Sequence, residues 1–158
     1  GNRQTYMGTK EEARYMKIII NMMLASVLQA YSEALVLGEK VNIPWETMID
    51  LIADSAAGAP IVKYKASTYK KRDFTPTSTV YNMYKDMKMA MELARNVNAN
   101  IPVSATTMQM YNSMVALGNE ELDNTSILLI NEIINGISWK GVKEKEELQW
   151  AKSEKTLS

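Results

Sequence analysis

The stretch "KEEARYMKIIINMMLASVLQAYSEALVL" (residues 10–37) decides the fold. Its apolar residues recur with the 3.6-residue period of an α-helix, and the apolar face is broad enough to be buried on most sides. It contains no proline, and Gly38 follows it as a stop signal. Roughly 28 residues at ~1.5 Å each give a rod of about 42 Å, which is long for a single domain. We therefore expect the rest of the chain to be built around this helix.

The other segments also have helical patterns, separated by short breaks rich in proline, glycine and asparagine. No strand pattern longer than a few residues and no internal repeat is found. The sequence therefore predicts one all-α domain of six or seven helices over residues 1–137. The polar residues 138–158 are predicted to form a terminal helix or a frayed tail. The further predicted helices cover residues 44–55, 61–71, 80–97, 102–117 and 125–135.

Composition excludes several kinds of function. The 158 residues include no cysteine and no histidine, which rules out thiol catalysis, Ser-His catalysis, disulfides and the usual zinc sites within the chain. Lys and Arg together number 18, as do Asp and Glu, so the net charge of zero argues against binding to nucleic acid or to an anionic membrane. No apolar run approaches the ~18 residues of a membrane span. The lack of cysteine fits a cytoplasmic protein, and we expect no metal site.

Two polar residues interrupt the apolar run at helical spacing. Lys17 and Asn21 are four residues apart, so they lie on one face of the predicted helix. A lysine in an apolar environment is a candidate acid or base, and an amide one turn away can orient a substrate oxygen. The simpler interpretation is a lysine that extends to water beside an exposed asparagine. Helical spacing alone favours this simpler interpretation.

Two other charged segments are best explained as solvated helix faces. The basic cluster "KYKASTYKKRD" (Lys63–Asp73) has the composition of a phosphate contact, but the net charge of zero favours a solvated face. Lys85 and Asp86 are adjacent, and adjacent helical residues do not face each other, so their spacing does not predict an ion pair between them.

The order of the motifs is more informative than any one of them. "KIIIN" (17–21) is followed by "EALVLGEKVNIP" (33–44) and then by "KDMKMAMELARNVNANIPVSATTMQMY" (85–111). From Gly8 to Glu132, this arrangement resembles the C-terminal domain of the β-hydroxyacid dehydrogenase family. That family includes 3-hydroxyisobutyrate dehydrogenase and the semialdehyde reductases and is related to 6-phosphogluconate dehydrogenase. The resemblance implies a helical substrate and oligomerisation domain of an NAD- or NADP-dependent enzyme.

The resemblance also implies roles for individual residues. Lys17 matches the family's catalytic lysine, the general acid/base for the substrate hydroxyl or carbonyl, and Asn21 matches the asparagine that helps to hold the substrate. Lys85 matches the lysine near the nicotinamide end of the cofactor, and Asp86 matches its helix-anchoring neighbour. Ser78 stands at a position beside the cofactor that is often aromatic in the family. The implied reaction is hydride transfer to or from the nicotinamide, with proton transfer by Lys17.

The cofactor domain of the family has no counterpart in this sequence. No G-x-G-x-x-G follows a predicted strand, whereas family members place a Rossmann domain before the lysine helix. We therefore expect the chain to be part of a longer protein, and to be inactive by itself. The expected partners are its own N-terminal Rossmann domain, a small hydroxyacid or semialdehyde, and further copies of the chain in a homo-oligomer.

Departures from the family pattern support an alternative function. The family has a glycine-rich turn before the lysine, and here only Gly8 matches it, with Glu11 and Ala13 at the other two glycine positions. Glycine is needed where the backbone closely approaches a ligand. Together with Ser78, these residues support a non-catalytic dimerisation or interaction domain that retains the fold.

Overall fold

The computed structural model describes residues 6, 8 and 11–137. Within these residues it confirms the predicted all-α class, with six α-helices and one short 3₁₀-helix around a long first helix. The polar extension 138–158 lies outside the described residues. The elements in order are α1 (Glu12–Lys40), α2 (Trp45–Asp54), α3 (Pro60–Lys71), α4 (Val80–Asn96), α5 (Pro102–Ala116), η1 (Asn124–Ser126) and α6 (Ile127–Ile134).

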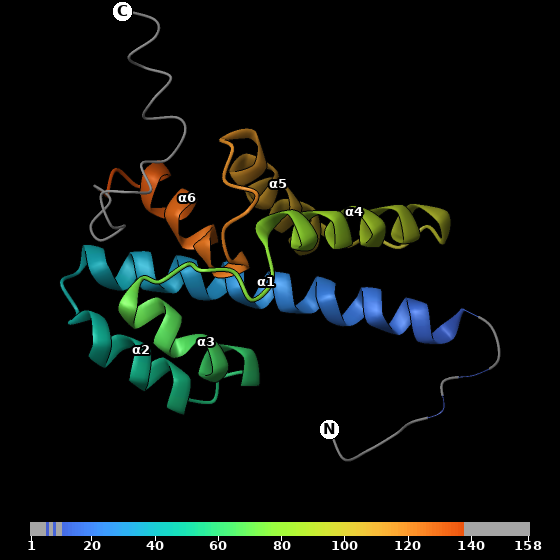
Figure 1. The fold of residues 1–158 in the computed structure, drawn as a ribbon. Coiled ribbons are helices and arrows are strands. Elements are labelled where there is room, and N and C mark those ends of the chain that lie inside the picture. Colours follow the sequence, from blue (N-terminus) through green and yellow to red (C-terminus); the bar gives the residue numbers. More distant parts are fainter. Residues whose placement is uncertain (1–5, 7, 9–10, 138–158) are drawn as a thin grey trace, which may run out of the picture.

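Helix α1 is the axis of the domain and contacts all five of the other α-helices (Figure 1). Helices α2 and α3 lie on one side of its C-terminal half, and α4, α5 and α6 lie on the other side of the helix. The core is formed around this C-terminal half, where Leu28 and Leu35 are fully buried. The expectation that other segments are built around the first helix is therefore confirmed for its C-terminal half.

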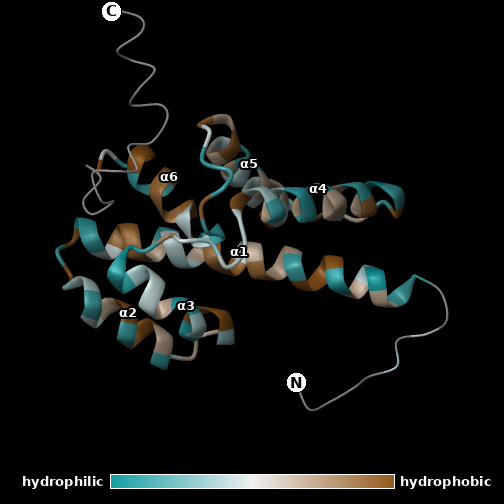
Figure 2. Cartoon of the chain, in the orientation of Figure 1, coloured by the Kyte–Doolittle hydropathy of each residue, from teal (hydrophilic) through white to brown (hydrophobic). Residues whose placement is uncertain are grey.

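The N-terminal half of α1 leaves a broad apolar face exposed, which we call the α1 apolar face. Figure 2 shows hydrophobic segments alternating with hydrophilic ones along this half, and the exposed fraction of its apolar side chains reaches 64% at Met23. A surface of this kind commonly marks an interaction site. The face consists of Tyr15, Met16, Ile19, Ile20 and Met23.

The length and composition of α1 would also allow it to cross a membrane. This corrects the expectation that no segment approaches such a span. The central helix of a globular core meets the same criterion, and the C-terminal half of α1 is packed inside this domain.

The first helix does not stop at Gly38 as predicted, but continues to Lys40. Gly38 is buried, and a Cβ atom added to it would overlap the sulfur of Met48 in α2. The absence of a side chain at Gly38 therefore allows Met48 of α2 to pack closely against α1, and a larger residue would require Met48 to move. The chain leaves the helix at Asn42 instead, which has a left-handed φ of 61°. Asparagine tolerates this conformation better than most residues.

The last predicted helix differs at its start. The chain enters it through the 3₁₀-helix η1, and the side chain of Asp123 accepts a hydrogen bond from the backbone N–H of Thr125 at 3.1 Å. An acidic residue is favoured at such a position because it satisfies a free backbone donor. The same segment pairs with the connector before α4 through a bridge between Thr79 and Asp123.

Candidate functional site

A polar contact links the middle of α1 to α4. The Nδ2 atom of Asn21 donates a hydrogen bond to Oδ2 of Asp86 at 2.7 Å, and both side chains are half-buried. One turn further along each helix, Ala25 and Ala90 are buried, so small residues accompany the contact on both helices. The simpler interpretation of Asn21 as an exposed amide is therefore wrong.

Lys17 lies one turn before Asn21 on the same helix and is exposed. Among the described residues, no hydrogen bond or ion pair involves its ammonium group. Its side chain thus emerges beside the α1 apolar face, while the neighbouring amide is held against α4. This arrangement leaves the ammonium group available to a ligand or to another protein surface that covers this face.

The turn before Lys17 is helical where the family pattern has glycines. Helix α1 begins at Glu12, and the carbonyl of Glu11 already accepts a hydrogen bond from the backbone N–H of Tyr15 at 2.9 Å. Ala13 lies within the first turn, and Glu11 forms an ion pair with Arg14 at 3.0 Å. Glu11 and Ala13 are therefore compatible with this local backbone, because a helix requires no glycine there.

Lys85 lies on the exposed side of α4 and lines an open groove of about 480 Å³. Lys88 and Arg95 add positive charge along the same helix, and Glu92 is the one acidic residue in the lining. The ammonium of Lys88 lies 5.5 Å from the centre of the Tyr84 ring. A groove of this composition suits an anionic ligand. Its full lining is Tyr81, Tyr84, Lys85, Lys88, Met89, Met91, Glu92, Arg95 and Met108.

Ser78 lies in the connector that precedes α4 and is half-buried. Its carbonyl accepts a hydrogen bond from the backbone N–H of Asn124 at 2.8 Å. The next residue, Thr79, caps α4 by accepting a hydrogen bond from the N–H of Asn82 at 3.1 Å. The backbone at Ser78 is therefore fixed relative to the start of the helix that carries Lys85.

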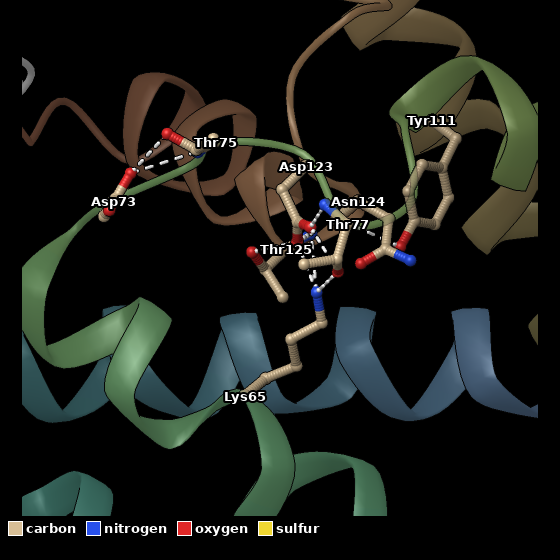
Figure 3. A network of polar contacts seen from close by, with 8 residues as sticks. All are labelled: Lys65, Asp73, Thr75, Thr77, Tyr111, Asp123, Asn124 and Thr125. Carbon is tan, nitrogen blue, oxygen red and sulfur yellow. Dashed lines mark hydrogen bonds and ion pairs between the residues drawn. The ribbon is translucent and has the colours of Figure 1, made fainter.

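A buried ion pair holds this connector in place (Figure 3). The ammonium of Lys65, in α3, lies 2.9 Å from Oδ1 and 2.8 Å from Oδ2 of Asp123, and both side chains are almost fully buried. The hydroxyl of Thr77, in the connector, accepts a third hydrogen bond from Lys65 at 2.6 Å. These contacts tie α3, the connector and the segment before α6 together.

The carboxylate of Asp123 is fully satisfied despite its burial. Thr77 donates to it from its backbone N–H at 2.9 Å and from its hydroxyl at 3.1 Å, and Thr125 does so at 3.1 and 2.7 Å. Burial alone would raise the pKa of Asp123, but the hydrogen bonds from Lys65, Thr77 and Thr125 outweigh it and lower the pKa. Asp123 is therefore held as a carboxylate.

Two members of the basic cluster, Lys65 and Arg72, form buried ion pairs, which corrects the prediction of a solvated face for these two residues, whereas Lys63 and Lys71 are exposed as predicted. The most buried member of the cluster, Lys65, is only 3% exposed. Sequence alone did not separate this lysine from its neighbours, although the Asp-x-Thr pattern at Asp123 is a recognisable capping signal. The ion pairs of the cluster, buried and exposed, are Lys63 with Asp54, Lys65 with Asp123, Lys70 with Asp50, and Arg72 with Glu132.

In the second deeply buried ion pair, the pKa of the carboxyl group is raised, whereas that of Asp123 is lowered. Arg72 donates to both carboxylate oxygens of Glu132, at 2.7 and 2.6 Å, and its guanidinium lies 5.2 Å from the Trp45 ring centre. Burial raises the pKa of Glu132, Arg72 opposes this rise, and the nearby Glu39 adds to it. The net result is a raised pKa.

Solved structures define the class of this fold. A 3-hydroxyisobutyrate dehydrogenase from Salmonella typhimurium matches with a TM-score of 0.72, at 24% identity, over 77% of this chain and 43% of its own. The enzyme of the same name from Mycobacterium tuberculosis, solved with L-serine, matches with a TM-score of 0.71, at 23% identity, over 79% of this chain and 45% of its own. The fold is thus shared with a part of these dehydrogenases.

The family model described as "NAD-binding of NADP-dependent 3-hydroxyisobutyrate dehydrogenase" matches residues 12–130. The chain belongs to this family, which confirms the resemblance to the β-hydroxyacid dehydrogenases. The description also confirms NAD or NADP as the cofactor of the family.

Curated relatives match over most of this chain but over less than half of their own length. Glyoxylate/succinic semialdehyde reductase 1 of Arabidopsis thaliana is 29% identical over 81% of this chain and 44% of its own. L-threonate dehydrogenase of Cupriavidus necator is 30% identical over 80% and 42%, respectively. A relative with a different kind of name, the cytokine-like nuclear factor N-PAC of Drosophila melanogaster, is 23% identical over 78% of this chain and 21% of its own.

Proposed function

We propose that this chain is the substrate-side and oligomerisation domain of an NAD(P)-dependent β-hydroxyacid dehydrogenase or semialdehyde reductase. The observation that carries the proposal is the arrangement on α1, where Lys17 is exposed beside an amide held by α4. The α1 apolar face adjoins this pair. A dinucleotide-binding domain packed on that face would bury Lys17 and complete a site at the boundary between the two domains.

The basic groove beside Lys85 fits the cofactor by its chemistry. Lys85, Lys88 and Arg95 line it, and positive side chains attract the phosphates of a dinucleotide. Lys85 and Ser78 are proposed to contact the cofactor, the latter through a backbone fixed by Asn124. When bound, the nicotinamide accepts or supplies the hydride.

The chain's own residues would handle the proton and the orientation of the substrate. In oxidation, the amine of Lys17, kept neutral by its burial under the second domain, would take the proton of the substrate hydroxyl, the carbon that bears this hydroxyl would give its hydride to the nicotinamide, and a carbonyl would be formed. In reduction, Lys17 returns that proton to the carbonyl oxygen. Asn21 holds the substrate with its oxygen towards Lys17, so that the proton moves over a short distance.

The test uses the longer protein that contains this chain together with a dinucleotide-binding domain. Oxidation of NADPH is measured with glyoxylate and with succinic semialdehyde, and reduction of NADP⁺ with 3-hydroxyisobutyrate and with L-threonate. Lys17→Ala is expected to lower kcat at least about 100-fold, the usual contribution of a general acid/base, while cofactor affinity by fluorescence titration changes little. Lys63→Ala, at an exposed lysine of α3, is the matched control. Turnover of Lys17→Ala within threefold of the parent would refute the role of Lys17.

A second candidate function is a non-catalytic dimerisation or interaction domain. It is supported by the helical turn at Glu11 and Ala13 and by the similarity to a protein named as a nuclear factor. Here the α1 apolar face would bind a second copy of the chain. Activity and light scattering together separate the two functions, because both predict association: an inactive longer protein whose chain still dimerises supports the second, and a strict monomer argues against it. A cytoplasmic location remains a prediction, and one relative is named as chloroplastic.

A further inference from the structure

We infer that Asp86 is a positioning residue that sets the orientation of the Asn21 amide, so that Oδ1 of Asn21 is the hydrogen-bond acceptor offered to the site. This inference rests on the proposed function for its catalytic meaning. Family resemblance gave Asp86 only the role of anchoring its own helix. The contact in the structure instead links it directly to the proposed substrate residue on α1.

The direction of the amide follows from the chemistry of the contact. A carboxylate accepts hydrogen bonds and cannot donate one, so the atom of Asn21 that lies 2.7 Å from Asp86 must be the nitrogen. The short distance is typical of a hydrogen bond to a charged group, which is about twice as strong as one between neutral groups. Rotating the amide by 180° would place its oxygen against the carboxylate, where two acceptors repel.

The contact with Asp86 also determines which hydrogen-bonding groups of Asn21 remain free to bind a ligand. Two donors and two lone pairs make up the hydrogen-bonding capacity of an amide, and Asp86 uses one donor of Asn21. Within the part of the chain that the structure describes, Oδ1 of Asn21 makes no hydrogen bond. Since Nδ2 faces α4, Oδ1 is directed away from Asp86. Its ligand is therefore a hydrogen-bond donor, such as an ammonium group or a hydroxyl group other than the one whose proton Lys17 takes.

The packing of α4 against α1 keeps Asp86 in place to hold the Asn21 amide in this orientation. Asp86 lies in α4 and Asn21 in α1, which pack against each other in the described domain. Both side chains are half-buried, so water competes less for the amide than at an exposed site. A change at Asp86 therefore alters the orientation of Asn21 without removing any group proposed to touch the substrate.

The first test needs neither cofactor nor substrate. In the ¹⁵N-labelled 158-residue chain, the side-chain NH₂ of Asn21, assigned by its loss in Asn21→Leu, is expected to show two well-separated proton resonances with slowed exchange. Asp86→Ala is expected to reduce this separation to that of a solvent-exposed asparagine amide and to speed the exchange at least threefold. Asp86→Asn, which keeps the size and polarity of the side chain, covers the case in which the alanine variant does not fold. Glu121→Gln makes the same carboxylate-to-amide change at an exposed position and should leave the resonances unchanged.

The second test measures the consequence for the reaction in the longer protein. With L-threonate, which carries hydroxyl groups besides the reacting one, Asp86→Asn is expected to lower kcat/KM about tenfold, mainly through KM, because the amide then populates both orientations. Asp86→Glu keeps an acceptor and should recover part of the loss. Unchanged Asn21 resonances in Asp86→Asn would overturn the inference even if the parent is an active dehydrogenase. If the parent is inactive, the proposed function fails while the resonances still decide the orientation.

Discussion

Replacing Lys65 by Met tests the buried ion pair most directly. Methionine has nearly the length and shape of the lysine stem but no ammonium group. The change removes three hydrogen bonds: two to Asp123, at 2.9 and 2.8 Å, and one to Thr77 at 2.6 Å. The carboxylate of Asp123 is then left buried without its counter-ion, and this determines the size of the effect.

The loss follows from what remains around the carboxylate. Breaking a buried pair by removing one partner typically costs about 3–5 kcal/mol. Four donors from Thr77 and Thr125 still reach Asp123, each worth about 1 kcal/mol net, so we expect the lower end, about 3 kcal/mol. Asp123→Asn should cost more, about 4–5 kcal/mol, because it leaves a buried ammonium group and an amide NH₂ facing threonine donors.

Equilibrium unfolding in urea, followed by far-UV circular dichroism, measures these losses as shifts in midpoint at constant m-value. The double variant Lys65→Met/Asp123→Asn removes both charges and should be at least about 2 kcal/mol more stable than the sum of the single losses predicts. Lys63→Met is the matched control on the same helix. Its ion pair with Asp54 is long, at 3.9 Å, and exposed, so the change should stay within about 0.5 kcal/mol.

Two results would refute this reasoning. One is a loss below about 1 kcal/mol in Lys65→Met, the size expected of a single neutral hydrogen bond. The other is strict additivity of the two single variants, since it would mean that the charges do not stabilise each other in the folded protein.

Two further predictions concern packing and pH. Gly38→Ala should destabilise the domain by about 1 kcal/mol, because the overlap with Met48 outweighs the gain in helix propensity; a higher melting temperature would contradict this. The raised pKa of Glu132 means that the folded state binds its proton more tightly, so stability should fall as pH rises from the unfolded to the folded pKa. Glu132→Gln should remove this slope, and an unchanged slope in urea titrations across pH 4–7 would contradict the assignment. The lowered pKa of Asp123 acts oppositely, since its stabilisation is lost as pH falls below its ordinary value of 3.8.

Much of the fold could be predicted because local rules suffice for it. Helical periodicity located α4 and α5 to within one residue and α1 to within three, since each carries a long apolar stripe and ends near glycine, asparagine or proline. The prediction that the first helix stops at Gly38 was wrong, because a glycine near the end of a helix has the same sequence signal whether it ends the helix or allows close packing. The role of Gly38 depends on Met48, a residue on another helix that no local pattern identifies.

Some features of the candidate site could likewise be predicted from the sequence, and others could not. The order of the motifs around Lys17 and Lys85 was sufficient to place the chain in its family, because motif order survives when individual residues change. The burial of Lys65 was not predictable from its own segment. A lysine in a basic helix is normally solvated, and only a carboxylate supplied 58 residues later reverses that expectation.

The sequence by itself therefore determined the all-α class, the central first helix, the family and the positions proposed for its chemistry. Periodicity and motif spacing are properties of neighbouring residues, so they can be found without coordinates. Only the tertiary structure decided that Asn21 is held by Asp86, that Lys65 is paired with Asp123, and that α1 leaves an apolar face exposed. Each of these facts depends on how separate helices pack, because burial and partners arise between segments far apart in the chain.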